Sequence, residues 1–261
     1  MLYQNKYLSV LNFLCAILLL SAFLWSGKAL SFETSAKAAY ILDQTTGTVI
    51  LEKNANRPLP PASMSKLMTL YIAFEYINQG RLDLTEKLPV SEAAVKYRGS
   101  TMFLNTSDRV SVEDLLRGII VLSGNDACVV LAEALSPDGT EEGFAKLMTK
   151  RAKKMGMLNS VFANSNGWPD PKHRMSVKDL AILANRIITD FPEYYPMFAE
   201  DTFEFDGRAA ANTRNRNPIL GLGIGADGLK TGHTTEAGYG LVGSALQEKR
   251  RVIFVVTGLR S

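Results

Sequence analysis

Apolar residues recur along the chain with two different periods, and each period is confined to particular regions. Near the beginning, the extended runs Ala38–Leu42 and Thr48–Glu52 flank a polar turn, which predicts a β-hairpin. Extended runs at Gly228–Thr234, Tyr239–Ala245 and Val252–Val256 predict three strands near the end of the chain. The last of these runs is apolar throughout, as is typical of a strand that is buried on both faces.

The middle of the chain follows the helical period instead. Apolar residues spaced at i, i+3, i+4 and i+7 predict five helices, at about residues 64–80, 111–122, 126–135, 144–156 and 176–188. This order predicts an α/β fold of the α+β type, in which both ends of the chain build one antiparallel sheet. We expect a sheet lobe of residues 38–62 and 200–261, an inserted all-helical lobe of residues 63–199, and a cleft between the two.

A separate pattern occupies residues 1–29. Lys6 is followed by an apolar run from Leu8 to Trp25 and then by small residues up to Ala29. This order is typical of a secretory signal peptide that is cleaved after Ala29. It predicts an exported protein, in the periplasm or on the extracytoplasmic face of the cell membrane. Since the run approaches the roughly 18 residues of a membrane span, an uncleaved anchor is the alternative.

Composition excludes several classes of function. Two of the 29 basic residues and none of the 26 acidic residues lie in the first 29 positions, so the remainder is nearly neutral. Such a balance argues against a nucleic-acid partner, which requires a clustered basic face. With Cys15 in the predicted signal segment, two histidines and one cysteine remain, too few for a closed zinc site of the Cys/His kind, and we expect no metal or cofactor. Cys128, flanked by alanine and valine, is expected to be a buried core residue.

The first candidate motif is Ser63-Met64-Ser65-Lys66, at the start of the first predicted helix. Residues three apart share a helix face, so the Ser63 hydroxyl and the Lys66 amine can meet. A serine needs a base to become a nucleophile, and lysine can serve only if its pKa falls well below about 10.4. Burial and a second cation would both lower it. Taken alone, the pair is equally typical of a solvated helix surface.

The second motif is Ser123-Gly124-Asn125, between the second and third predicted helices. Ser123 could pass a proton between Lys66 and a leaving group. The Asn125 amide could hold Lys66 and contact a substrate backbone. Taken alone, the motif is equally typical of a helix-breaking turn, which serine, glycine and asparagine all favour.

The third motif is Lys230-Thr231-Gly232, in the first of the C-terminal strands. Lys230 could supply the second cation that keeps Lys66 neutral. Thr231 could bind a carboxylate, and Gly232 could let a substrate approach the strand edge. Taken alone, the motif is also compatible with an ordinary turn at a strand end.

The three motifs together resemble those of the active-serine penicillin-recognising enzymes, in which Ser-x-x-Lys, Ser-x-Asn and Lys-Thr-Gly follow in this order. Here the second lies 60 residues after the first, and the third about 105 further on. Their surroundings resemble the low-molecular-weight penicillin-binding proteins, specifically the serine-type D-alanyl-D-alanine carboxypeptidases of peptidase family S11. The resemblance extends from about Ala38 onward and includes Asn215-Arg216-Asn217. The stretches that carry it are Pro-Ala-Ser63-Met-Ser-Lys66-Leu-Met-Thr, Ser123-Gly-Asn125-Asp-Ala and Asp-Gly-Leu-Lys230-Thr-Gly-His233-Thr.

The resemblance implies a β-lactamase/penicillin-binding-protein-like fold and removal of the terminal D-alanine from peptidoglycan stem peptides. Ser63 would form the acyl-enzyme, Lys66 would be the general base, and Ser123 would pass the proton to the departing D-alanine. β-Lactam antibiotics would acylate the same serine. The main-chain N–H groups of Ser63 and His233 would form the oxyanion hole. The implied substrate-binding residues are Asn125, Arg216, Lys230, Thr231, Gly232 and His233.

Three alternatives remain open. A class A β-lactamase would carry a glutamate in the loop that corresponds to Ser160–Met175, and this loop contains none. A D,D-endopeptidase or transpeptidase would use the same residues. A non-catalytic penicillin- or peptidoglycan-binding protein would be expected to lack reactive residues, all of which are present. The side chain of His233 is as compatible with a packing role as with a direct one.

The resemblance also implies a longer protein. In the family, the strand corresponding to Val252–Val256 is followed by a basic residue near the site, a helix that covers the sheet and, in many members, a β-rich domain and a membrane-anchoring helix. The sequence stops at Ser261. We therefore expect residues 30–261 to be a truncated catalytic domain, poorly soluble because one sheet face lacks a cover. Membrane contact is expected only through the signal segment or a missing C-terminal anchor.

Overall fold

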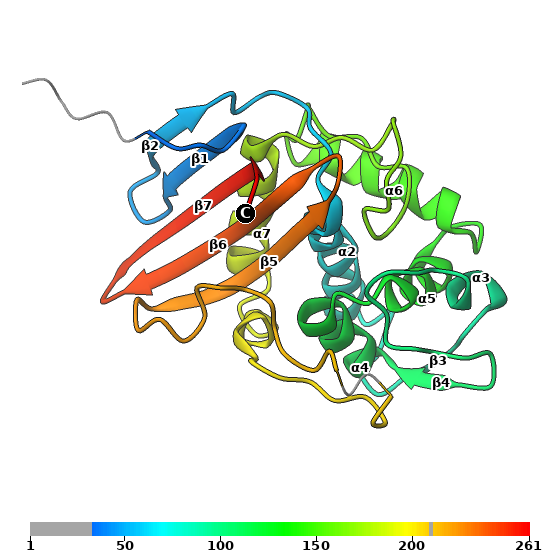
Figure 1. The fold of residues 1–261 in the computed structure, drawn as a ribbon. Helices are drawn as coiled ribbons and strands as arrows, with labels where there is room; N and C mark the ends of the chain where they lie inside the picture. Colours follow the sequence, from blue (N-terminus) through cyan, green and yellow to red (C-terminus); the bar gives the residue numbers. More distant parts are fainter. Residues whose placement is uncertain (1–32, 209–210) are drawn as a thin grey trace, which may run out of the picture. The chain divides into compact units, whose positions relative to one another are not determined.

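An antiparallel sheet joins the two ends of the described chain. The computed structural model describes residues 33–208 and 211–261. The five strands lie side by side in the order β2-β1-β7-β6-β5 (Figure 1). The predicted antiparallel sheet built from both chain ends is therefore confirmed. Its strands are β1 (Ala38–Asp43), β2 (Thr48–Lys53), β5 (Ala226–Thr234), β6 (Gly238–Gln247) and β7 (Arg250–Leu259).

Helices form most of the regular secondary structure between β2 and β5 in the described residues. Each of the five predicted helices is present, although the first begins with a 3-10 turn and the second ends in a turn of π-helix. A short helix and a two-stranded sheet, β3 (Lys87–Pro89) with β4 (Arg109–Ser111), add to them. The helical elements are η1 (Ala62–Ser65), α2 (Lys66–Asn78), α3 (Glu92–Val95), α4 (Val112–Arg117), η2 (Gly118–Leu122), α5 (Asn125–Leu135), α6 (Glu141–Lys154), α7 (Val177–Asp190) and η3 (Tyr195–Ala199).

Serine side chains cap the starts of two of these helices. Ser111 Oγ accepts a hydrogen bond from the N–H of Asp114 at 3.1 Å, and Ser176 Oγ accepts one from the N–H of Asp179 at 3.1 Å. Each bond satisfies a backbone donor that has no partner inside the helix. The starts of α4 and α7 are thus determined locally.

One face of the sheet packs on α7, which lies behind β6 and β7 in Figure 1. Ile253 and Val255 point to this face and are fully buried, whereas Val252, Phe254 and Val256 alternate with them and are only partly buried. The prediction that this strand is buried on both faces is therefore wrong for the described residues. Alternation places every second side chain on the other face.

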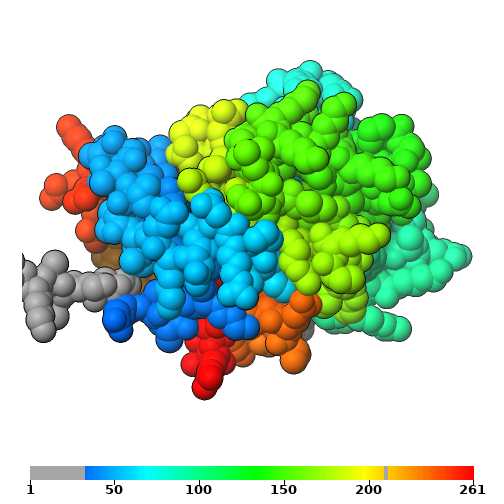
Figure 2. Space-filling view, turned by 90° about the horizontal axis from the view of Figure 1, so that it is seen from above, coloured from blue at the N-terminus to red at the C-terminus, as the bar shows by residue number. Residues whose placement is uncertain are grey.

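The two ends of the chain pair along the whole of β1. Tyr40 lies opposite Val255, and Ile41 lies opposite Phe254. In Figure 2 the blue N-terminal strands and the red C-terminal strand lie together, apart from the green helical segments. Residues 35–261 form one compact unit. The predicted signal peptide, residues 1–29, lies outside the described residues. Across residues 33–208 and 211–261, no helix has both the length and the apolar character of a membrane span.

A polar cluster under the sheet holds the beginning of β5. Arg251 of β7 donates to both carboxylate oxygens of Asp227, at 2.8 and 2.7 Å, and to Ser244 Oγ of β6 at 2.6 Å. Tyr195 Oη of η3 donates to Asp227 Oδ1 at 2.8 Å. Bidentate pairs of this kind combine bond strength with a defined geometry. The cluster therefore sets the position of the strand that carries Lys230.

Replacing Arg251 by methionine is expected to lower the free energy of unfolding by about 2 kcal/mol, because a largely buried carboxylate loses its partner. The Arg251 side chain is 12% exposed in its pair with Asp227. Lys146→Met serves as the control, because both side chains of the Lys146–Glu142 pair are more than 70% exposed. It should change the free energy of unfolding by less than about 0.5 kcal/mol. Urea unfolding measures both. Equal effects would contradict the structural role of the cluster.

Candidate active site

Ser63 lies in the 3-10 turn that precedes α2. Pro60 and Pro61 end the extended chain after β2, and Ala62–Ser65 then form one turn before the α-helix begins at Lys66. Within residues 61–74, Ser63 is the one residue that is not fully buried. The turn therefore presents the Ser63 hydroxyl at the surface of an otherwise inaccessible segment.

Lys66 is fully buried, and three oxygen atoms surround its amine. Lys66 Nζ donates to Ser63 Oγ at 2.9 Å, to Asn125 Oδ1 at 2.7 Å and to the main-chain oxygen of Asn166 at 2.5 Å. The expected contacts of Lys66 with Ser63 and Asn125 are therefore present. The contact with Asn166 was not predicted.

This arrangement suits both protonation states of the amine. An ammonium has three N–H donors, and three acceptors are available. A neutral amine has two N–H donors and one lone pair. When Asn125 and Asn166 accept the two N–H groups, the lone pair points at Ser63, whose hydroxyl can then donate. The geometry thus allows Lys66 to take the proton of Ser63.

Burial and nearby charges change the pKa of both site lysines. Burial lowers the pKa of Lys66 to about 8, with a further decrease from Arg216 and opposing effects of Cys128, Asp126 and Glu141. Burial also lowers the pKa of Lys230 well below its usual value, and the charges of Lys66 and Arg216 add to this effect. Two buried cations so close together do not both stay protonated.

The acceptors around Lys66 can stabilise a charged amine. Lys66 Nζ has three oxygen partners among the described residues. A buried charge requires such partners. Because burial lowers the pKa of both amines, the expectation that a charged Lys230 keeps Lys66 neutral stays a prediction.

Ser123 has a left-handed backbone, with φ +62°, at the junction of η2 and α5. Its buried Oγ has no hydrogen-bond partner among the described residues, and it lines the same cavity as Ser63 and Thr231. A hydroxyl without a partner is available to a substrate group. Two residues on, Asn125 Nδ2 donates to the main-chain oxygen of Arg98 at 2.7 Å.

The cleft extends to both sides of Ser63. One cavity, of about 650 Å³, contains Ser63, Ser123, Arg216 and the edge of β5 from Thr231 to His233. A second, of about 480 Å³, contains Ser63, Asn125, Asn166 and Trp168. The predicted cleft between the sheet and the helices is therefore present. It could accommodate an extended chain across the serine.

Arg216 and the strand β5 form the rim of this cleft. Arg216 donates to Ser100 Oγ at 2.9 Å and to the main-chain oxygen of Leu122 at 3.2 Å. A Cβ on Gly232 would lie 3.0 Å from the main-chain oxygen of Pro61, so the strand passes close to the Ser63 turn. The ring of His233 contacts the ring of Tyr239 in a tilted arrangement, with centroids 4.0 Å apart, which favours a packing role for the side chain.

The loop 164–168 is the part of the site that sequence reasoning missed. Asn166 contributes a main-chain oxygen, which no residue type specifies. Gly167 has φ +83°, and a Cβ there would lie 1.9 Å from the main-chain oxygen of Ala62. Only glycine allows the loop to pack this closely against the Ser63 turn. The Asn-Gly dipeptide was the available signal, although it indicates only a turn.

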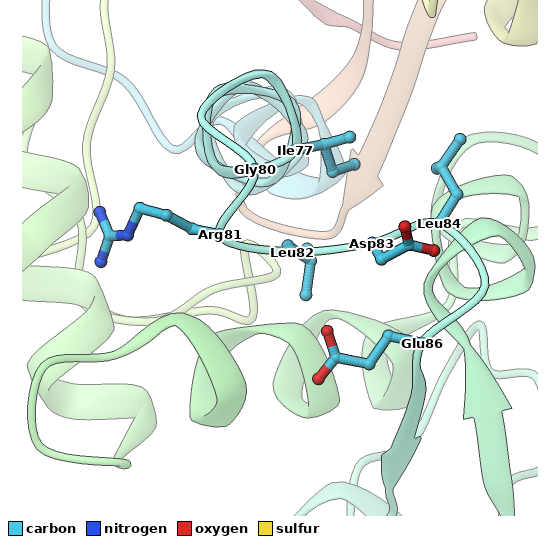
Figure 3. Close-up of a pocket in the computed structure, with 7 residues that line it drawn as sticks. All are labelled: Ile77, Gly80, Arg81, Leu82, Asp83, Leu84 and Glu86. Atoms are coloured by element: carbon cyan, nitrogen blue, oxygen red, sulfur yellow. The ribbon is translucent and has the colours of Figure 1, made fainter.

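Another hollow, of about 330 Å³, lies at the end of α2 (Figure 3). All of its lining residues come from the single stretch 77–86, and its charged side chains are exposed. It is the inside of one loop and shares no residue with the Ser63 cleft. Among residues 33–208 and 211–261, no three His, Cys, Asp or Glu side chains gather as metal ligands would.

The motifs Ser63–Lys66, Ser123–Asn125 and Lys230–Gly232 meet at one cleft, from α2, the start of α5 and β5. Fold and site together define the class of active-serine, penicillin-recognising proteins. A model of the family described as D-alanyl-D-alanine carboxypeptidase, peptidase S11, matches residues 26–261. The chain belongs to this family.

Curated relatives show the same relationship. The chain is 37% identical to D-alanyl-D-alanine carboxypeptidase DacF of Bacillus subtilis over 85% of its own length and 57% of that protein. It is 36% identical to DacA of Haemophilus influenzae over 97% of its own length and 66% of that relative. The chain is 38% identical to DacC of Escherichia coli, over 88% of its own length and 58% of that relative. The chain therefore spans less than two thirds of the length of these relatives.

Solved structures of penicillin-binding proteins share the fold. Penicillin-binding protein 5 from Haemophilus influenzae superposes with a TM-score of 0.84 at 36% identity, over 89% of this chain and 68% of that one. Penicillin-binding protein D2 from Listeria monocytogenes was solved in the ampicillin-bound form. It superposes with a TM-score of 0.78 at 31% identity, over 88% of this chain and 92% of that one. The predicted β-lactamase/penicillin-binding-protein-like fold is therefore confirmed.

The free energy of unfolding should depend on pH through Lys66. Its pKa is about 8 in the folded chain against 10.5 ordinarily, so the unfolded chain binds more protons between these values, and stability rises with pH there. Lys66→Met removes this dependence, worth about 3 kcal/mol. The stability of Lys66→Met relative to the wild type should therefore fall as the pH rises from about 8 to 10.5.

Urea unfolding at a series of pH values measures this difference. Lys150→Met, at an exposed position on α6, is the matched control and should follow the wild-type curve. A Lys66→Met variant whose stability changes with pH in parallel with the wild type would show that the buried amine is not the titrating group.

Proposed function

We propose that this chain acts as a serine-type D-alanyl-D-alanine carboxypeptidase. It removes the terminal D-alanine from peptidoglycan stem peptides through an acyl-enzyme on Ser63. The observation that carries the proposal is the fully buried Lys66 amine, 2.9 Å from Ser63 Oγ. The names of the relatives support the choice of substrate.

Acylation starts from the neutral form of Lys66. Ser63 Oγ attacks the carbonyl carbon between the two D-alanines while its proton passes to Lys66 Nζ. The main-chain N–H groups of Ser63 and His233 stabilise the negative oxygen that forms. When the C–N bond breaks, Ser123 passes the proton to the nitrogen of the departing D-alanine. Water then attacks the ester and releases the shortened peptide and Ser63.

Substrate binding uses the rim of the cleft. Arg216, Thr231 and Ser123 hold the terminal carboxylate, and a charge-assisted bond to Arg216 would replace its present contact with Ser100. Asn125 contacts the peptide backbone, and Gly232 lets the substrate lie along β5. Lys230 supports the carboxylate through its position behind Thr231.

β-Lactam antibiotics are the second proposed partner. A β-lactam would acylate Ser63 in place of the peptide, as the ampicillin-bound structure of the Listeria relative suggests. Rapid hydrolysis of the lactam is not expected, because the loop Ser160–Met175 contains no glutamate to activate water. Because peptidoglycan lies outside the cell membrane, this function requires the export predicted from residues 1–29.

The test is the site of acylation. Fluorescent penicillin followed by peptide mapping should place the label on Ser63, and Ser63→Ala should abolish both the label and D-alanine release from a D-Ala-D-Ala pentapeptide. Ser65→Ala is the matched control, because this buried hydroxyl donates to the main-chain oxygen of Ala62 and Ser65 lines neither cavity beside Ser63. Labelling that survives in Ser63→Ala would defeat the assignment. Cleavage of cross-linked peptides in preference to the pentapeptide would indicate an endopeptidase.

The rate of acylation should rise with pH toward about 8, since the fraction of neutral Lys66 rises through its pKa of about 8. Lys66→Arg should retain the fold and lose acylation, because a guanidinium does not act as a base at neutral pH. Rates of penicillin labelling between about pH 6 and 9, together with circular dichroism of the variant, measure both effects. Normal labelling by Lys66→Arg would assign the base to another group.

A further inference from the structure

The first residue of α6 directs a carboxylate at the loop beside Lys66. Glu141 Oε1 accepts hydrogen bonds from the N–H of Ser165 at 2.9 Å, from Ser165 Oγ at 2.5 Å and from Asn166 Nδ2 at 3.3 Å. Glu141 Oε2 accepts one from Tyr97 Oη at 2.5 Å. Both oxygens are therefore occupied. The start of a helix also favours a negative charge at this position.

The same loop is tied down at further points. Thr69 Oγ1 of α2 donates to the main-chain oxygen of Ser165 at 2.6 Å. Asn164 Oδ1 accepts from the N–H of Gly167 at 2.8 Å, and Asn166 Oδ1 accepts from the N–H of Trp168 at 2.8 Å. The loop is thus held between α2 and α6. In this position the main-chain oxygen of Asn166 points at Lys66 Nζ.

We propose that Glu141 is a positioning residue for the general base: it holds the 164–168 loop so that the Asn166 carbonyl orients the amine of Lys66 toward Ser63. This inference rests on the proposed function and adds a residue to it. Without the Asn166 acceptor, a neutral Lys66 would have one fixed N–H, and its lone pair could turn away from Ser63. Glu141 acts on the reaction only through this loop.

The carboxylate of Glu141 is an anchor and not a second base. Its two oxygens accept four hydrogen bonds from Tyr97, Ser165 and Asn166, which leaves little capacity to bind a hydrolytic water. Tyr97, whose pKa is raised by burial and by Glu141, stays protonated and keeps donating to it. The glutamate that reaches this loop therefore has a different role from the loop glutamate of a class A β-lactamase.

Glu141 also contributes to the charge balance around Lys66. Its negative charge raises the pKa of Lys66, together with Asp126 from α5, whereas Arg216 lowers it. Lys230 on β5 faces the same amine, and His173, in the loop that follows Asn166, is also within electrostatic range of it. Loss of the Glu141 charge should therefore lower the pKa of Lys66.

Two substitutions separate position from charge. Glu141→Gln can retain part of the hydrogen bonding but removes the charge, so the midpoint of the acylation pH profile should move to lower pH. Glu141→Ala also releases the loop, so the maximal acylation rate should fall about tenfold or more, as displaced catalytic groups typically do. The control is Glu142→Gln, on the same helical turn but 79% exposed and paired with Lys146, which should leave both quantities unchanged.

Penicillin-labelling rates as a function of pH measure these effects in the wild type and the three variants. Thermal unfolding of each variant measures stability alongside. A purely structural role would lower the melting temperature without moving the midpoint of the pH profile, and that result would overturn the proposal. An unchanged rate in Glu141→Ala would do the same.

A second measurement does not depend on catalysis. The ¹³Cε resonance of Lys66, assigned by its absence in Lys66→Met, reports the protonation of the amine directly. It should titrate at lower pH in Glu141→Gln than in the wild type, and an identical titration would overturn the proposal. If the wild type itself were not labelled by penicillin, the proposed function would fail. A titration shift in Glu141→Gln would still show that Glu141 controls the amine.

Discussion

The burial of one amine constrains the rest of the site. Lys66 is fully buried, and its amine is acceptable there only with polar partners. Those partners come from three segments: the turn with Ser63, the start of α5 with Asn125, and the loop with Asn166. The helices must pack so that these segments meet around Nζ. The same desolvation that makes the arrangement costly lowers the pKa of the amine enough for it to act as a base near neutral pH.

Electrostatics in the pocket is a balance and not the effect of a single pair. Arg216 opposes protonation of the buried Lys66 amine, while Asp126 and Glu141 favour it. Asp126 has a further task, because its carboxylate accepts hydrogen bonds from the N–H groups of Met102 and Leu104 and so fixes the segment that follows Ser100. The acids near the site therefore shape the cleft and set the charge of the base at the same time.

The sheet supplies the other wall, and its contribution is mainly geometric. β5 passes so close to the Ser63 turn that a side chain at Gly232 would meet the main-chain oxygen of Pro61. The ion pair between Asp227 of β5 and Arg251 of β7 fixes the beginning of the strand. The ring of His233 contacts the ring of Tyr239 on the neighbouring strand β6.

The sequence by itself determined the features that depend on local pattern: the strands at both ends, the helices between them, and the three motifs whose order identified the family. Only the tertiary structure decided the rest. A main-chain acceptor such as the Asn166 carbonyl leaves no trace in residue type. Glu141 meets Asn166 from 25 residues away, through the packing of α6. Which lysine holds the proton depends on desolvation and on available acceptors, and both are properties of the assembled pocket rather than of any segment.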